Sequence, residues 1–189
     1  MIKIGILGDI GSGKSYAAKN FGYPVFNADI EVGKLYKKDR KIFNKLKKIF
    51  PKYIYSFPIN KNEISNAILV NKSNLKKIVK IVHLEIRKKM NIFLKKNENK
   101  KIVILDIPLL LENKINKKKD ILIFVQSKKS QIFKRLKKRK NLNLKLLKKF
   151  RSIQLPLDYK KKKSHFIIKN NFTKLKIKKS IRDILKEIL

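Results

Sequence analysis

The stretch Gly8-Asp9-Ile10-Gly11-Ser12-Gly13-Lys14-Ser15 decides the fold, because it fills every fixed position of the Walker A pattern, G-x-x-x-x-G-K-[ST]. Residues 2–7 before it alternate Ile and Leu with Lys and Gly, which predicts a short buried strand. Residues 14–21 after it predict the start of a helix. The sequence therefore predicts a phosphate-binding loop between a strand and a helix, with a chance glycine turn as the alternative.

The residue types in this loop suit nucleotide chemistry. Glycines let successive backbone N–H groups turn toward phosphate oxygens, and the N-terminus of the following helix adds partial positive charge. We expect Lys14 to reach the β- and γ-phosphates of ATP, and the Ser15 hydroxyl to coordinate Mg²⁺. The predicted nucleotide contacts are Gly11, Ser12, Gly13, Lys14, Ser15 and Tyr16.

Further apolar runs predict the rest of an α/β domain. Short strands are expected at residues 24–26, 101–105, 121–125 and 166–168. The second and third of these are almost continuously apolar, as in parallel sheets that helices cover on both faces. Helical segments are expected at residues 30–50, 63–94, 128–140 and 174–189. Strands separated by helices predict a three-layer, doubly wound parallel sheet of the P-loop NTPase type.

The same patterns suggest how one domain is organised. We predict a core of residues 1–38, 100–138 and 164–189. Residues 39–99 lack clear strand signals, which indicates a helical insertion.

Two of the 13 acidic residues follow predicted strands directly: Asp29 and Asp106. The carboxyl ends of parallel strands face the same crevice as the phosphate loop, so both carboxylates are candidates for the reaction centre. One can orient or deprotonate an attacking hydroxyl, and the other can hold Mg²⁺ through water. The alternative is that each caps a following helix.

Several segments of the chain resemble segments of the dephospho-CoA kinase family. Asn27–Tyr36 (NADIEVGKLY) resembles the family's DAD…LY segment, and Asp106–Glu112 (DIPLLLE) resembles its DIPLLFE motif. Three further segments resemble its other blocks: His83–Arg87, Gln154–Pro156 followed by Lys160, and Phe166–Asn171. Together these segments span nearly the whole chain.

The resemblance implies transfer of the ATP γ-phosphoryl group to the ribose 3′-hydroxyl of dephospho-CoA, which completes coenzyme A. It implies Asp29 as the base and Lys14 as a catalytic cation. It also implies a lid at about residues 139–163, with Arg135 or Arg139 as its contribution to the site. It also implies that residues 39–99 bind the CoA moiety. The substrate contacts that it implies are His83, Arg87, Asp106 and Leu109.

Five residues depart from the family pattern. The first Asp of DAD is Asn27, and the Pro after His83 is Leu84. The Thr that usually follows Ser15 is Tyr16, and the usual Ala-Asp before the last strand is Ser164-His165. The predicted cation, magnesium ligand and base are all retained.

The composition bears on two alternatives to this function. The net charge of +38 raises the possibility of a basic nucleic-acid-associated NTPase, but only 6 of the 51 basic residues are Arg, the residue favoured for reading nucleic acid. Lys, Asn and Ile make up about half of the chain, which favours an AT-biased genome over a selected polyanion partner. Another small-molecule or nucleotide kinase is the second alternative.

The remaining expectations concern compartment and assembly. The chain has no Cys, so a reducing cytoplasm is the simplest compartment. No apolar run approaches the roughly 20 residues of a membrane helix. We expect a small-molecule substrate, no specific nucleic-acid or membrane partner, and a monomer or weak oligomer.

Overall fold

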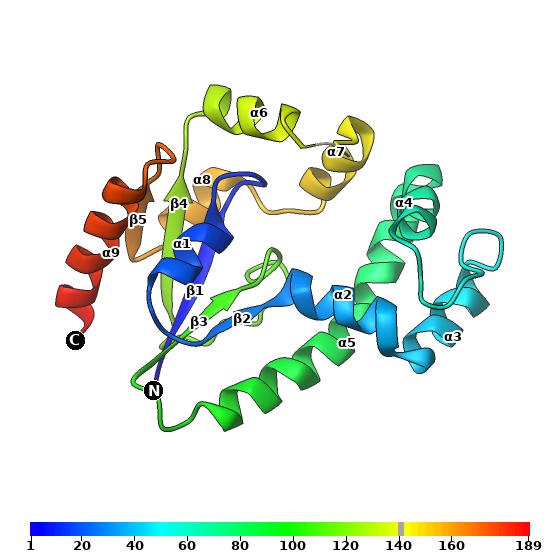
Figure 1. The fold of residues 1–189 in the computed structure, drawn as a ribbon, viewed down its shortest axis with the longest axis horizontal. Coiled ribbons are helices and arrows are strands. Elements are labelled where there is room, and N and C mark those ends of the chain that lie inside the picture. The colour runs from blue at the N-terminus through cyan, green and yellow to red at the C-terminus, as the bar shows by residue number, and fades with distance from the viewer. Residues whose placement is uncertain (140–141) are drawn as a thin grey trace. The chain divides into compact units, whose positions relative to one another are not determined.

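Five parallel strands form one sheet in the order β2-β3-β1-β4-β5 (Figure 1). The computed structural model describes residues 1–139 and 142–189. β1 is central and pairs on both sides, with Gly5 opposite Leu105 and Leu122. The five strands predicted from the apolar runs are confirmed. Their bounds are β1 Ile2–Gly8, β2 Val25–Asn27, β3 Ile102–Asp106, β4 Ile121–Gln126 and β5 Phe166–Lys169.

The chain divides into two compact units, and the first holds the sheet. It comprises residues 1–27, 96–142 and 154–189, and the second comprises residues 28–95 and 143–153. The helices of the first unit are α1 Lys14–Asn20, α6 Lys129–Lys137, α8 Leu157–Lys162 and α9 Lys174–Ile188.

Alternation along the strands separates the two faces of the sheet. Ile4 and Ile6 of β1 lie in the core formed with α1 and α9. α9 contributes Ile177, Ile181 and Ile184, whose spacing gives one apolar stripe. Burying such side chains contributes about 1.5–3 kcal/mol each. This face is the main hydrophobic core of the first unit.

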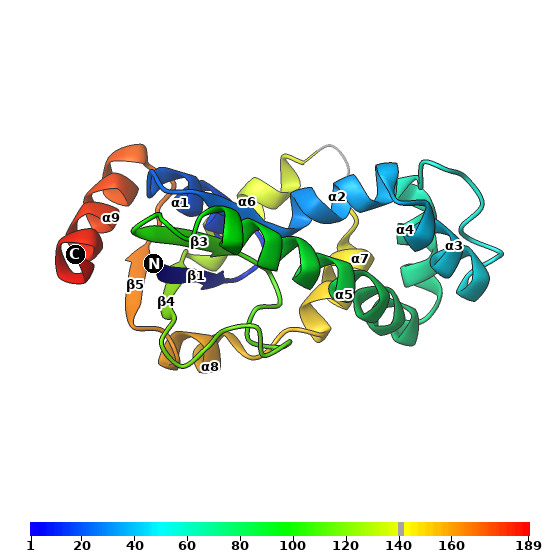
Figure 2. The ribbon, with the colours of Figure 1, turned by 90° about the horizontal axis from the view of Figure 1, so that it is seen from below.

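The opposite face of the sheet is packed closely against β1 at Gly5. A Cβ at Gly5 would lie 2.5 Å from Leu110 Cδ2 and 3.0 Å from Leu122 Cδ2. The segment after β3 therefore packs against the sheet at this point. α8 lies on the side of the sheet opposite α1 (Figure 2). Helical layers on both sides confirm the three-layer α/β fold.

The described part of the second unit is helical. Its helices are α2 Ala28–Lys38, α3 Arg40–Ile49, α4 Lys61–Val70, α5 Lys72–Lys96 and α7 Leu144–Ser152. Within the described ranges, no helix combines the length and the apolarity that crossing a membrane requires.

Two segments predicted as single helices, 30–50 and 63–94, are each divided in two. Asp39 separates α2 from α3, and its Oδ1 accepts a hydrogen bond of 3.0 Å from the Ile42 N–H as the N-cap. Asn71 separates α4 from α5 in an extended conformation, and its Oδ1 accepts from the Ser73 N–H at 2.9 Å. In both places a backbone N–H donates to a nearby side-chain oxygen instead of to a helical carbonyl, and the helix is interrupted there.

The predicted lid, residues 139–163, contains two helices that the sequence pattern did not separate, α7 and α8. Residues 140–141 of this segment lie outside the described residues. Within the second unit, α7 is tied to the end of α4, where Lys149 Nζ donates to the carbonyls of Ile68 and Leu69 at 2.8 and 2.7 Å. A cation at the C-terminus of a helix satisfies carbonyls that have no helical partner.

Candidate phosphate-binding site

The Walker A segment forms a loop whose glycines are required by its backbone. Gly8, Gly11 and Gly13 have φ values of 144°, 87° and 93°, which L-residues with side chains rarely adopt. A Cβ at Gly8 would lie 2.6 Å from the Val125 carbonyl oxygen. The three glycines therefore allow the chain to turn within a few residues between β1 and α1.

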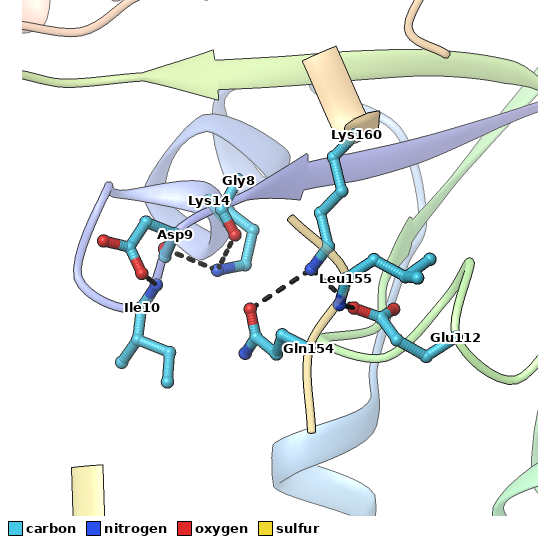
Figure 3. A network of polar contacts seen from close by, with 8 residues as sticks. All are labelled: Gly8, Asp9, Ile10, Lys14, Glu112, Gln154, Leu155 and Lys160. Carbon is cyan, nitrogen blue, oxygen red and sulfur yellow. Dashed lines mark hydrogen bonds and ion pairs between the residues drawn. The ribbon is translucent and has the colours of Figure 1, made fainter. Parts of the chain in front are cut away.

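The Lys14 ammonium group lies across the start of this loop. Its Nζ donates to the carbonyl oxygens of Gly8 at 3.2 Å and Asp9 at 2.9 Å (Figure 3). Asp9 Oδ1 in turn accepts from the Ile10 N–H at 2.7 Å. These bonds hold the Lys14 cation against the backbone at the start of the loop.

Two other loop residues present hydroxyl groups. Ser12 Oγ is buried and, within the described part of the chain, has no hydrogen-bond partner. Ser15 is exposed in the first turn of α1, and its hydroxyl is a hard oxygen of the kind that Mg²⁺ prefers. Tyr16 is 43% exposed. The glycine cradle and these oxygen groups fit a bound magnesium–nucleotide complex.

Asp106 ends β3 as a buried carboxylate, 3% exposed. Its Oδ2 accepts a hydrogen bond of 2.6 Å from the Asn27 amide, which ends the neighbouring strand β2. Asn27, which stands where the family has its first Asp, thus acts as a hydrogen-bond donor to the Asp106 carboxylate. A turn, not a helix, follows Asp106, so the helix-cap alternative is wrong for this residue. Leu109 lies half-buried in that turn.

Asp29 lies in the first turn of α2, in the second unit, and its side chain is exposed. It is the second helical residue, not the residue that precedes the helix, so it is not at the N-cap position. Its predicted role as the base stays a prediction.

His83 and Arg87 lie one turn apart on α5, also in the second unit. Burial and the nearby Arg87 charge lower the pKa of His83, which favours the neutral imidazole. Among the described residues, His83 Nε2 is one of three buried side-chain atoms without a hydrogen-bond partner. The shared helix places both side chains on one face, as the motif predicted.

The two lid arginines do not share a helix face, contrary to the interpretation of residues 128–140 as one helix. Arg135 is in α6, and its guanidinium lies 4.3 Å from the centroid of the Phe172 ring. α6 ends at Lys137, so Arg139 lies beyond it, and its N–H donates to the Leu136 carbonyl at 3.0 Å. The helix ends early because this basic segment has no apolar stripe beyond Leu136.

The structure also brings together residues that the sequence did not assign to a site. Lys160 is buried in an ion pair with Glu112 (Nζ to Oε1, 2.7 Å) and donates to Gln154 Oε1 at 3.1 Å (Figure 3). The same Glu112 oxygen accepts from the Leu155 N–H at 2.9 Å. Glu112 and Gln154 both belong to segments that resemble the family, and this was the only sequence signal for the cluster.

Comparisons with known proteins identify the family. A family model described as dephospho-CoA kinase matches residues 2–175. The dephospho-CoA kinase of Wolbachia sp. subsp. Brugia malayi (strain TRS) is 34% identical, over 96% of this chain and 95% of that relative. The enzyme of the same name from Bartonella quintana (strain Toulouse) is 32% identical, over 87% of each chain.

Solved structures agree with the fold. TT1252 from Thermus thermophilus superposes with a TM-score of 0.80 at 25% identity and covers 100% of this chain and 98% of that one. A dephospho-CoA kinase from Campylobacter jejuni has a TM-score of 0.62 at 22% identity, over 98% and 96% of the two chains. On the family match and the sequence relatives, the chain belongs to the dephospho-CoA kinase family of ATP-dependent kinases.

Proposed function

We propose that the protein transfers the γ-phosphoryl group of ATP to the ribose 3′-hydroxyl of dephospho-CoA, giving CoA and ADP. The observation that carries this proposal is a complete phosphate loop, with Lys14 fixed across its start, in a chain that the dephospho-CoA kinase model matches over residues 2–175.

In the proposed reaction, the Asp29 carboxylate accepts the proton of the 3′-hydroxyl. The hydroxyl oxygen then forms a bond to the γ-phosphorus, and the bond from that phosphorus to the β–γ bridging oxygen breaks, so that ADP leaves. Lys14 and Arg139 balance charge on the transferred group. Mg²⁺, held through Ser15, would neutralise the phosphates when it is bound.

The substrate side of the proposal rests on the family resemblance. Asp106 and Leu109 follow β3 and are proposed to contact the acceptor, and His83 and Arg87 are proposed to contact the CoA moiety. Residues 39–99 would form the region that binds CoA, and residues 139–163 the lid. We further propose a cytoplasmic monomer or weak oligomer that needs no nucleic-acid partner.

The direct test is turnover with defined substrates. Purified protein is incubated with ATP, Mg²⁺ and dephospho-CoA, and CoA and ADP are quantified by chromatography. We expect equal amounts of the two products. ADP formed only with a different acceptor would favour another small-molecule kinase, and ADP formed only with nucleic acid would favour a nucleic-acid-dependent NTPase.

The loop is tested by Lys14→Ala. Because transition-state contacts of this kind contribute about 2.7–4 kcal/mol, we expect kcat to fall at least a hundredfold while the thermal midpoint stays unchanged. Lys19→Ala, on the last turn of the same helix, is the matched control and should retain full activity. Near wild-type turnover in Lys14→Ala would remove this loop from the mechanism.

A further inference from the structure

A carbonyl group inside the phosphate loop is held from outside the loop by two donors. The Ser12 carbonyl oxygen accepts from Ser127 Oγ at 3.0 Å and from Asn170 Nδ2 at 2.8 Å. Ser127 follows the last residue of β4, and Asn170 follows the last residue of β5. β4 and β5 are neighbours in the sheet (Figure 1). The residues after these two strands therefore converge on one loop carbonyl.

Asn170 is held through its backbone N–H and through both polar atoms of its side chain. It is 3% exposed, and its backbone N–H donates to the Gln126 carbonyl at 2.7 Å. Its Oδ1 accepts from the Phe172 N–H at 2.7 Å. A backbone N–H can only donate, so Oδ1 faces Phe172 and Nδ2 must face Ser12.

Holding the Ser12 carbonyl also sets the direction of the next N–H group. The peptide between Ser12 and Gly13 is planar and trans, so its N–H points away from its carbonyl oxygen. With the oxygen directed toward Asn170 and Ser127, the Gly13 N–H is directed to the other side of the peptide. Gly13 also lets Asn170 approach, since a Cβ there would lie 2.4 Å from Nδ2.

We propose that Asn170, together with Ser127, is a positioning residue for ATP: the two side chains orient the Ser12–Gly13 peptide so that the Gly13 N–H donates to a phosphate of the nucleotide. This inference rests on the proposed nucleotide site at residues 8–15. It assigns part of the phosphate affinity to residues more than a hundred positions away in the sequence.

The variant Asn170→Asp separates this role from a role in the turn at Phe172. Aspartate still accepts from the Phe172 N–H, but it cannot donate to Ser12 and places a carboxylate oxygen against that carbonyl. We expect the Kd for ATP, measured by titration calorimetry, to rise about tenfold or more. We expect kcat at saturating ATP to change by less than about threefold, because the contact forms in the ground state as well as in the transition state.

Matched variants control for charge and for the second donor. Asn171→Asp adds the same charge one residue along, where the side-chain oxygen accepts from Thr173, and should change the Kd less than about twofold. Ser127→Ala removes one donor without adding charge and should raise the Kd about threefold. Ser164→Ala removes a hydroxyl that donates to the Lys160 carbonyl, and should leave the Kd unchanged.

The outcomes are decisive in both directions. An Asn170→Asp protein that binds ATP as well as Asn171→Asp, or a Ser127→Ala protein that binds as well as wild type, would overturn the proposal. So would a loss of kcat and thermal stability without a change in Kd, because that pattern marks a structural role. If Lys14→Ala keeps wild-type turnover, the nucleotide site itself is wrong; if that variant is inactive and Asn170→Asp binds normally, only the present inference fails.

Discussion

Asp29 is the residue on which the proposed chemistry depends most. Its position inside the first turn of α2 gives its charge a favourable interaction with the helix macrodipole, which is worth about 0.3–1 kcal/mol. A catalytic base would have a much larger effect on turnover than that. A single substitution can therefore separate the two roles.

We expect Asp29→Asn to lower kcat by at least a hundredfold while the Kd for ATP changes less than about twofold, because the amide keeps the size of the side chain but cannot accept the proton. Steady-state kinetics and ATP titration measure the two quantities. Asp39→Asn is the matched control, since Asp39 is the N-cap of α3 and Asn caps nearly as well. Equal kcat values in the two variants would mean that Asp29 is not the base.

At the scale of elements, Glu63 organises the loop that precedes α4. Its Oε2 accepts from the backbone N–H groups of Tyr55 at 2.9 Å and Ser56 at 3.3 Å, and its Oε1 accepts from the Ser56 hydroxyl. Burial alone would raise the pKa of Glu63, but the hydrogen bonds from Ser56 and Tyr55 outweigh burial and lower the pKa below 4.5. The ionised form therefore stabilises the second unit.

This stabilisation has a predictable pH dependence. Because the folded pKa is depressed, the contribution is complete above the unfolded pKa and is lost as pH falls through the folded pKa. We expect Glu63→Gln to lower the free energy of unfolding by about 1 kcal/mol at pH 7. We also expect that difference from wild type to shrink below pH 4.5.

Urea denaturation from pH 7 to pH 3 measures both effects. Glu98→Gln, at an exposed carboxylate, is the control and should match wild type throughout. A difference between Glu63→Gln and wild type that stays constant across this range would contradict the assignment of the stabilisation to the ionised carboxylate.

The elements also show which structural signals are visible in a sequence. Every strand was predicted, because an apolar run next to turn residues has few alternatives in an α/β chain. The breaks at Asp39 and Asn71 were not predicted, because apolar spacing continues across both positions. At each break a side-chain oxygen accepts a hydrogen bond from the backbone N–H two or three residues on, at the start of the next helix. Hydrophobic periodicity does not reveal such a bond.

At the scale of the whole molecule, the charge of +38 predicts adhesion to any polyanion. We expect weak binding to duplex DNA that is independent of base sequence and falls at least tenfold between about 50 and 200 mM salt. Fluorescence anisotropy with two unrelated duplexes measures it, and kinase turnover without DNA is the control. A complex that persists at high salt, or that prefers one duplex, would instead indicate a selected nucleic-acid partner.

The candidate site was predictable only where one segment carries the chemistry. The phosphate loop is eight consecutive residues, so its pattern is complete in the sequence. Asn170 and Ser127 act on that loop through the strand order of the sheet, which brings together residues far apart in the chain. Asn170 lies in the segment Phe166–Asn171 that resembles the family, but that resemblance gave it no role, and Ser127 follows an ordinary strand. Contacts of this kind can be identified only when the strand order and the register of the sheet are known.

The buried Lys160 has a consequence for chemical labelling. Of the lysines whose side chains the structure describes, it alone is buried, at 1% exposure. An amine-acylating reagent needs access to Nζ, so brief treatment of the native protein should label its neighbours Lys161–Lys163 and leave Lys160 unmodified. Peptide mass spectrometry would monitor the acylation of Lys160. We expect this acylation only when the contacts of Lys160 with Glu112 and Gln154 break. Although the chain is rich in lysine, the rate at which Lys160 becomes labelled thus measures how often the first unit opens at this one site.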